Sequence, residues 1–287
     1  MASILEACNV GFAYSPEKWA IREMNFVLSE PRRICLLGAN GVGKSTLMLL
    51  LNGTLRPYEG ELLVLGQPLD YSKSGMQRIH RQVGIVLQDP DDQLFGATVE
   101  QDVAFGPLNN GLTSFEAREL VRKTLADLAI LHLIDRPIHE LSLGEKKRVA
   151  LAGVLVLNPK VLLLDEPTAG LDLVGVRSML NLLARLHEAG TTIVISTHET
   201  DIAYEWGEEA WILMDGRIAA RGPVSEVMRD RELLRAAHLR FPWMVEVGLA
   251  IQAAFPDLAG QPLPVDRDGV IELIQETRRC MEAAPLL

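Results

Sequence analysis

The octapeptide GANGVGKS at residues 38–45 constrains this chain most, because it lies between two apolar runs, at residues 34–37 and 47–51. A strand, this G-x-x-x-x-G-K-[ST] loop and then a helix form the context in which the pattern binds phosphate. Backbone N–H groups can wrap a polyphosphate only where side chains are absent, which accounts for Gly41 and Gly43 at the tight turns. The pattern therefore predicts a phosphate-binding loop rather than a plain strand-to-helix turn.

The helix that begins near Lys44 is expected to direct its free N–H groups and its positive dipole end at the anion. Lys44 can place a positive charge on the β- and γ-phosphates, and Ser45 can offer a hydroxyl to Mg²⁺. We therefore expect a nucleoside triphosphate, ATP, and Mg²⁺ as the bound groups. The expected loop contacts are Gly38, Asn40, Gly41, Gly43, Lys44, Ser45 and Thr46.

Two acidic residues follow the apolar run at residues 161–164, which has no polar alternation and is expected to be a central strand buried on both faces. Asp165 has the place of the second Mg²⁺ anchor of a P-loop NTPase. Glu166 is placed to orient or deprotonate the attacking water. His198 ends another buried run, at residues 192–197, and is interpreted as a γ-phosphate sensor. Strand 83–87 ends at Gln88, at the kind of strand end where ligand contacts are expected.

The composition of the chain limits the kinds of molecule that it is expected to bind. The chain has 287 residues, 48% of them hydrophobic, and a formal net charge of −10, which argues against a nucleic-acid partner. The short basic stretch at residues 146–148 is interpreted as a solvated helix face. No apolar run approaches the roughly 18 to 20 residues that cross a bilayer, and no leader for secretion is expected.

The predicted fold class is α/β, a P-loop NTPase core with three additions. Strand-like runs at residues 4–12, 21–28 and 61–65 predict an antiparallel β subdomain, with Tyr14 in the loop between the first two runs. A helical insert is expected over about 91–157: residues 114–128 have a helical period, and the helix opened by residues 141–145 runs to Leu157.

The composition shifts from about residue 225 onwards, which divides the chain into a nucleotide-binding domain at 1–224 and a helical extension at 225–287. The extension is expected to contain a charged helix over 226–239, an apolar-rich helix over 244–255 and a last helix over 268–282. Two interpretations stay open: a tail that docks a partner or a second copy, and a simple packing extension.

The order and spacing of these motifs resemble the ATP-binding subunits of ABC transporters over essentially residues 4–240. The most specific feature is the signature segment LSLGE, residues 141–145, which lies between the P-loop and the Asp165 strand. Leu143 and Glu145 replace the commonest Gly and Gln of that segment. Neither change removes a phosphate-facing group, so the activity is still expected.

The resemblance implies further roles. Tyr14 would stack on adenine, and Gln88 would reach Mg²⁺ and the attacking water. Ser142 and Gly144 would touch the γ-phosphate bound to a second copy, because each chain carries one P-loop and one signature segment, so that two chains arranged head to tail form two complete sites. The implied catalytic residues are Lys44, Gln88, Glu166 and His198; the implied Mg²⁺ ligands are Ser45, Gln88 and Asp165; and the implied nucleotide contacts outside the loop are Tyr14, Ser142, Gly144, Glu145 and Asp172.

A narrower resemblance rests on QDPDDQLF at residues 88–95 and on residues 102–106, which are similar to the energy-coupling-factor branch. Residues 69–72 and 146–150 look like the cobalt and nickel import ATPases of the CbiO type. That resemblance implies a transmembrane coupling protein and a membrane metal-binding component as partners. It also implies cobalt import as the function, with nickel or a vitamin as the alternative cargo, and a peripheral place on the cytoplasmic face of the cell membrane.

Two other functions are disfavoured by the sequence. A soluble ABC ATPase acting on DNA or ribosomes would be expected to show a long heptad insertion, a second cassette or net positive charge. A non-hydrolysing nucleotide sensor has no need of a general base, whereas Lys44, Gln88, Asp165, Glu166 and His198 occur together here.

Overall fold

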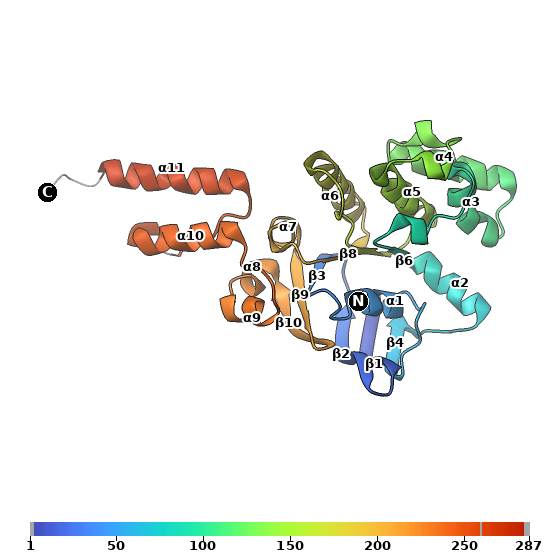
Figure 1. Ribbon diagram of the computed structural model, residues 1–287, viewed down its shortest axis with the longest axis horizontal. Helices are drawn as coiled ribbons and strands as arrows, with labels where there is room; N and C mark the ends of the chain where they lie inside the picture. The colour runs from blue at the N-terminus through green and yellow to red at the C-terminus, as the bar shows by residue number, and fades with distance from the viewer. Residues whose placement is uncertain (1–2, 259, 284–287) are drawn as a thin grey trace.

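The computed structural model describes residues 3–258 and 260–283, and a six-stranded sheet lies at its centre (Figure 1). Its strand order is β10-β9-β3-β8-β7-β6. Strands β3, β6, β7, β8 and β9 run parallel, and β10 pairs antiparallel with β9. The strands are β3 (Arg33–Leu37), β6 (Val83–Val86), β7 (Val161–Asp165), β8 (Thr192–Thr197), β9 (Glu209–Met214) and β10 (Arg217–Pro223). Every residue of β7 and β8 is buried, as their apolar runs predict.

The predicted antiparallel β subdomain is confirmed as a second sheet with the order β2-β1-β4-β5. Its strands are β1 (Leu5–Ser15), β2 (Lys18–Leu28), β4 (Glu59–Val64) and β5 (Gln67–Pro68). The placement of Tyr14 in a loop is wrong, because the ladder continues to the pair Ser15 with Lys18 and leaves only residues 16–17 for the turn. Tyr14 is therefore held in β1.

Helices cover the central sheet and form the insert. Helix α1 (Lys44–Leu51) follows the P-loop, α2 (Lys73–Gln82) precedes β6, and α6 (Leu173–Glu188) and α7 (Thr200–Trp206) flank β8. The insert consists of α3 (Val99–Asn109), α4 (Ser114–Asp127) and α5 (Leu143–Leu155), with 3₁₀ turns at Pro90–Asp92, Leu131–Leu133 and Ile138–Glu140. Figure 1 shows these three helices grouped at one end of the molecule.

Helix α3 was not predicted, because Gly106 and Pro107 read as a break in the sequence. Proline cannot donate a backbone hydrogen bond, but Pro107 lies in the last turn of α3, where little of the helix is left to disrupt. A Cβ on Gly106 would lie 3.4 Å from Leu157, so the glycine brings α3 close to the segment after α5.

The buried carboxylate of Glu209, at the start of β9, connects this strand to β10 on one side and to the residue before β3 on the other. Glu209 is 4% exposed and accepts hydrogen bonds from Trp211 Nε1 (2.6 Å), Arg221 Nε (2.5 Å) and Arg32 Nη1 (3.2 Å). Removing the charge leaves these donors poorly matched in a buried site.

Glu209→Gln is therefore expected to lower the free energy of unfolding by about 2–4 kcal/mol. Denaturant titration of both proteins measures the loss. Glu208→Gln is the control: that neighbouring side chain is 41% exposed, so its ion pair with Arg33 contributes about 1 kcal/mol or less. Equal losses for the two variants would show that the Glu209 contacts do not stabilise the sheet.

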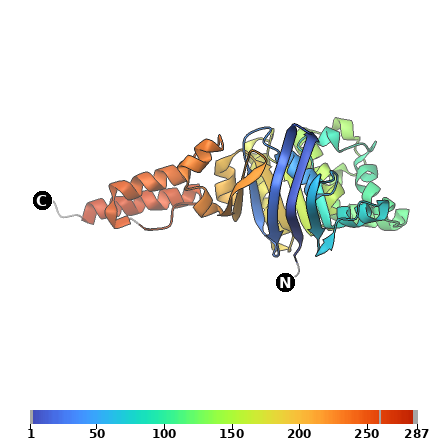
Figure 2. The same cartoon turned by 90° about the horizontal axis from the view of Figure 1, so that it is seen from below.

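The C-terminal extension is helical, as predicted, but its first helix is not continuous. The expected helix over residues 226–239 is in fact α8 (Val224–Val227) and α9 (Arg231–Ala236), because Asp230 caps the second helix by accepting from Leu233 N–H at 2.9 Å. Helix α10 (Trp243–Ala254), a 3₁₀ turn (Pro256–Leu258) and α11 (Arg267–Ala283) then form a hairpin that projects from the core (Figures 1 and 2).

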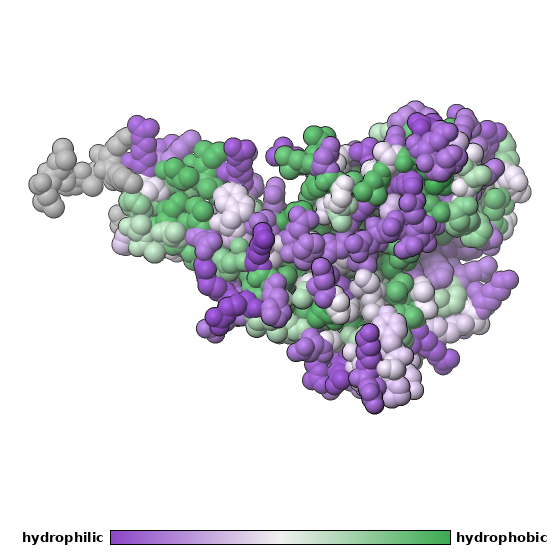
Figure 3. Space-filling model, in the orientation of Figure 1, coloured by the Kyte–Doolittle hydropathy of each residue, from purple (hydrophilic) through white to green (hydrophobic). Residues whose placement is uncertain are grey.

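Apolar side chains are exposed along this hairpin, as the green surface in Figure 3 shows, and they include Trp243, Leu249, Ile271 and Ile274. Among the residues that the structure describes, no helix combines the length and the apolar character needed to cross a bilayer.

Candidate functional site

A cavity of about 500 Å³ lies where the carboxyl ends of β3, β7 and β8 meet the β subdomain. It brings together most of the residues predicted from sequence, from five separate parts of the chain. Its predicted lining residues are Tyr14, Asn40, Gly41, Gly43, Lys44, Ser45, Thr46, Gln88, Asp165, Glu166 and His198. Gly38 takes part through its carbonyl, which accepts from Lys44 Nζ at 2.9 Å.

The loop before α1 has the open backbone that a phosphate site needs. Gly41 and Gly43 have φ of +78° and +111°, and a Cβ at Gly41 would meet no heavy atom within 4 Å. Helix α1 has no side-chain cap at Gly43, so its first N–H groups are available to an anion. The loop therefore fits the phosphates of a nucleotide.

Lys44 is buried at the floor of the cavity. Its ammonium donates to the carbonyls of Gly38 (2.9 Å) and Ala39 (3.3 Å) and lies 3.9 Å from Glu166 Oε1. Burial lowers the pKa of Lys44, and the charges of Glu166 and Asp165 oppose that shift. The positive charge of Lys44 thus offsets the negative charges of Glu166 and Asp165 in a poorly solvated cavity.

Asp165 and Glu166 are fixed from β8. Ser196 Oγ donates a short hydrogen bond to Asp165 Oδ1 and accepts from the Glu166 N–H at 3.0 Å. Glu166 Oε1 lies 3.0 Å from His198 Nδ1, whereas Glu166 Oε2 is buried without a hydrogen-bond partner among the described residues. A buried acceptor without a partner is costly, so this oxygen suits a bound water.

Oxygen donors in the same cavity suit a hard cation. Ser45, Gln88 and Asp165 all line it and offer a hydroxyl, an amide carbonyl and a carboxylate, which are ligand types that Mg²⁺ accepts alongside phosphate oxygens. In the described part of the chain, no group of three or more His, Cys, Asp or Glu side chains is arranged to hold a metal ion by itself.

Besides Ala169, three further lining residues were missed by sequence reasoning: Lys18, Trp19 and Ala20. They begin β2, and the tight turn after β1 returns them beside the P-loop, so the length of the hairpin was the signal that could have found them. The Tyr14 hydroxyl is hydrogen-bonded to Thr46 Oγ1 at 3.0 Å, while the ring is 58% exposed. This hydrogen bond connects the aromatic residue of the cavity to the helix that follows the P-loop.

The signature segment lies outside this cavity within one chain. Ser142 is the N-cap of α5: its hydroxyl accepts from the Glu145 N–H, and Glu145 Oε2 accepts from the N–H and the hydroxyl of Ser142 at 2.8 Å each. These hydrogen bonds lower the pKa of Glu145. Gly144 lies in the first turn, and Asp172 caps α6 by accepting from Gly175 N–H at 2.7 Å.

The interpretation of residues 146–148 as a solvated face is wrong. Lys147 is 4% exposed, and its ammonium donates to the carbonyls of Glu166 (3.0 Å) and Pro167 (3.3 Å). Lys146 pairs with Asp91 at 2.6 Å, and Arg148 donates to Ser178 Oγ at 2.9 Å. Helical spacing was the missed signal, because positions 150, 151 and 154 on the same face are apolar.

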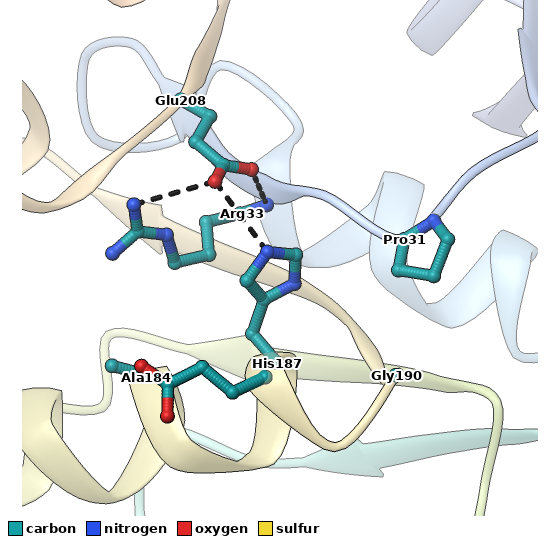
Figure 4. A pocket seen from close by; sticks show the side chains of 7 residues that line it. Pro31, Arg33, Ala184, His187, Gly190 and Glu208 are labelled. Carbon is teal, nitrogen blue, oxygen red and sulfur yellow. Dashed lines mark hydrogen bonds and ion pairs between the residues drawn. The ribbon is translucent and has the colours of Figure 1, made fainter.

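A second cavity, of about 550 Å³, lies at the opposite edge of the sheet, where β3 begins and α6 ends (Figure 4). There the carboxylate of Glu208 accepts from the N–H and the Nη2 of Arg33, at 3.0 and 3.3 Å, and lies 3.4 Å from His187 Nε2. Each carboxylate oxygen of Glu208 thus has a partner, whereas Arg33 Nε is buried without a hydrogen-bond partner among the described residues. None of the predicted site residues lines this cavity.

A P-loop after β3, an acidic pair after β7 and a histidine after β8 in one cavity define a P-loop NTPase. The family described as ABC transporter matches residues 21–169. The chain therefore belongs to the ABC transporter family of ATP-binding proteins, and it is an ATPase that binds ATP.

The similarity extends to relatives over most of the chain. The cobalt import ATP-binding protein CbiO of Rhodobacter capsulatus is 43% identical over 94% of this chain and 96% of its own length. The energy-coupling factor transporter ATP-binding protein EcfA of Methanocaldococcus jannaschii is 43% identical over 83% of this chain and 86% of its own. The predicted resemblance to the energy-coupling-factor branch is confirmed.

Two solved structures have a fold similar to that of this chain. CbiO1 of Clostridium perfringens, described as part of the ABC transporter complex CbiONQ, has a TM-score of 0.73 and 42% identity over 86% of this chain and 99% of its own. The ATP-binding cassette MJ0796, solved as a dimer with ADP and Pi, has a TM-score of 0.70 and 25% identity over 77% of this chain and 98% of its own. The predicted ABC ATPase fold is confirmed.

Proposed function

We propose that this chain is the ATP-hydrolysing subunit that energises import of a transition-metal ion, cobalt first among the candidates, through membrane partner proteins. The observation that carries the ATPase step is the convergence of Lys44, Asp165, Glu166 and His198 on one cavity. Cobalt is supported by the named function of the Rhodobacter capsulatus relative. Nickel or a vitamin would use the same ATPase chemistry with different membrane partners.

The geometry of the cavity supports the proposed roles. Lys44 places its charge on the β- and γ-phosphates, and Ser45, Gln88 and Asp165 hold Mg²⁺, which when bound neutralises the charge on the phosphate oxygens. Glu166 accepts a proton from the attacking water. His198, hydrogen-bonded to Glu166 Oε1, keeps that carboxylate oriented and contacts the γ-phosphate.

Tyr14 is proposed to stack on adenine. Tyr14 lines the cavity and is largely exposed, its hydroxyl is hydrogen-bonded to Thr46, and its ring makes a T-shaped contact with Phe12 at a centroid distance of 5.0 Å. A ring held by an aromatic neighbour and by its hydroxyl loses little entropy when a base stacks on it.

The complete site is proposed to need a second copy of the chain, arranged head to tail. Ser142 and Gly144 lie at a helix N-terminus suited to an anion, yet they do not line the cavity of their own chain. Glu145 and Asp172 are proposed to contact the nucleotide from the same partner surface. The dimeric MJ0796 cassette supports such an assembly.

The membrane partners are proposed to be a transmembrane coupling protein and a membrane metal-binding component, which places this chain on the cytoplasmic face of the membrane. Exposed aromatic residues on the insert support a protein contact there. Phe95 and Phe105 are 66% and 49% exposed, pack edge-on at 4.6 Å, and lie just after Gln88 in sequence and at α3.

The proposal predicts that uptake of radioactive Co²⁺ in cells carrying this chain with its co-encoded membrane components exceeds that of cells carrying Lys44→Ala by tenfold or more. Lys44→Ala should abolish uptake because it removes the charge that binds phosphate. Parallel uptake of Ni²⁺ ranks the cargo. Uptake equal in the two strains would contradict a transport ATPase, and co-purification with nucleic acid or ribosomes alone would favour a soluble role.

A further inference from the structure

We propose that Lys147 is a positioning residue that holds the peptide of Glu166 and so couples helix α5, with its signature segment, to the catalytic carboxylate. The inference rests on the proposed role of Glu166 in hydrolysis. It concerns a residue that the sequence pattern had assigned to a solvated surface.

Glu166 has a strained backbone. Its φ is +45°, in the left-handed region that costs a non-glycine residue about 1–2 kcal/mol. Such a conformation persists only where the surroundings fix it. This backbone turn is what lets the chain leave β7 with Asp165 and Glu166 both lining the cavity.

Hydrogen bonds hold the backbone of Glu166 in this conformation. The N–H of Glu166 donates to Ser196 Oγ of β8 at 3.0 Å. Its carbonyl accepts from Lys147 Nζ of α5 at 3.0 Å and from the Ala169 N–H at 3.1 Å. The backbone of Glu166 is therefore held at its N–H by the sheet and at its carbonyl by the helical insert.

Burying the charge of Lys147 is costly unless its ammonium is hydrogen-bonded. An ammonium that is 4% exposed needs hydrogen-bond partners, and the carbonyls of Glu166 and Pro167 supply two. Burial lowers the pKa of Lys147, and the charges of Glu166, Asp89 and Asp165 oppose that shift. A buried charge whose partners are backbone carbonyls fixes those carbonyls in turn.

Leu143 and Lys147 connect helix α5 of the insert to residues 166–170. Leu143, in the first turn of α5, packs over Gly170, whose Cβ would lie 2.8 Å from the leucine Cδ2. Lys147 and Leu143 lie one turn apart and hold residues 166–170 at both ends. Helices α3 and α4 pack on α5, so a displacement of the insert would move Lys147 and, through it, the peptide of Glu166.

The experiment measures Mg²⁺-dependent phosphate release and ATP affinity for the full chain and for Lys147→Met, Lys147→Gln and Lys147→Arg. Lys147→Met is expected to lower kcat by about 10- to 100-fold with less than a threefold change in Kd for ATP, because a small misplacement of a catalytic group is costly. Lys147→Arg, which keeps the charged donor, is expected to restore kcat to within threefold of the parent. Lys147→Gln keeps a neutral donor and should lie between them.

Lys146→Met is the matched control: this neighbouring lysine pairs with the exposed Asp91, so the variant should keep the parent kcat. In a Glu166→Gln background, Lys147→Met should cause no further loss, because both changes act through one group. A parent kcat in Lys147→Met, or an equal further loss in the Glu166→Gln background, would overturn the inference. Absence of turnover in the parent chain would instead overturn the proposed function.

Discussion

Glu166→Gln is expected to lower kcat for ATP hydrolysis by about 10²- to 10⁴-fold while ATP still binds. Glutamine keeps the size of the side chain but cannot accept the proton of the attacking water. It also removes a buried negative charge 3.9 Å from Lys44, so electrostatic attraction of the phosphates is not weakened. The variant should therefore accumulate as the ATP-bound dimer, measured by light scattering beside phosphate release.

A matched control is available one residue beyond His198. Glu199 is exposed, accepts from Thr168 Oγ1 at 3.4 Å and does not line the cavity, so Glu199→Gln should turn over ATP at the parent rate. If Glu166→Gln hydrolysed ATP as fast as Glu199→Gln, the carboxylate would not be the general base and the assignment of Glu166 would fail.

Local pattern was enough to predict the phosphate side of the site. Lys44, Asp165 and His198 each follow an apolar strand, and the carboxyl ends of parallel strands meet at one edge of a sheet. The polar residues that follow these strands in the sequence can therefore be predicted to converge at that edge of the sheet. The structure places all three on the cavity, as the sequence predicts.

The parts that sequence reasoning missed depend on contacts between distant segments. Trp19 reaches the cavity only because the β1–β2 hairpin closes within two residues, which is set by the register of the ladder. Because Lys147 is charged, the sequence predicts that it is exposed. Hydrogen bonds to the carbonyls of Glu166 and Pro167 instead stabilise it in a buried position. No property of residues 146–148 alone reveals those carbonyls.

Two helix boundaries were also predicted wrongly, one for a tertiary reason and one for a local reason. A proline near the end of α3 costs little where packing against α5 holds the helix. A capping aspartate, Asp230, splits a charged stretch whose composition alone favours a single helix. Proline costs about 3 kcal/mol in a helix interior and less in the last turn, so the packing of α3 on α5 decides the outcome at Pro107. At Asp230 a local cap of about 1 kcal/mol decides it.

Gly43→Ala is expected to lower the free energy of unfolding, measured without nucleotide, by about 3–5 kcal/mol, whereas Gly41→Ala should cost about 1 kcal/mol. Both glycines have positive φ, so both substitutions meet backbone strain. They differ in what surrounds them: a Cβ at Gly43 would lie 2.7 Å from the carbonyl oxygen of Ala20, while a Cβ at Gly41 meets nothing within 4 Å.

The comparison separates two reasons for glycine in one loop. Strand β2 packs directly on Gly43, so a methyl group there must displace either the loop or the strand that carries Trp19 and Ala20. Gly41 is open on the nucleotide side, and its substitution should weaken ATP binding more than folding. Denaturant titration and nucleotide titration of both variants test this. Equal losses of stability would show that positive φ alone, and not the packing of β2, requires glycine at position 43.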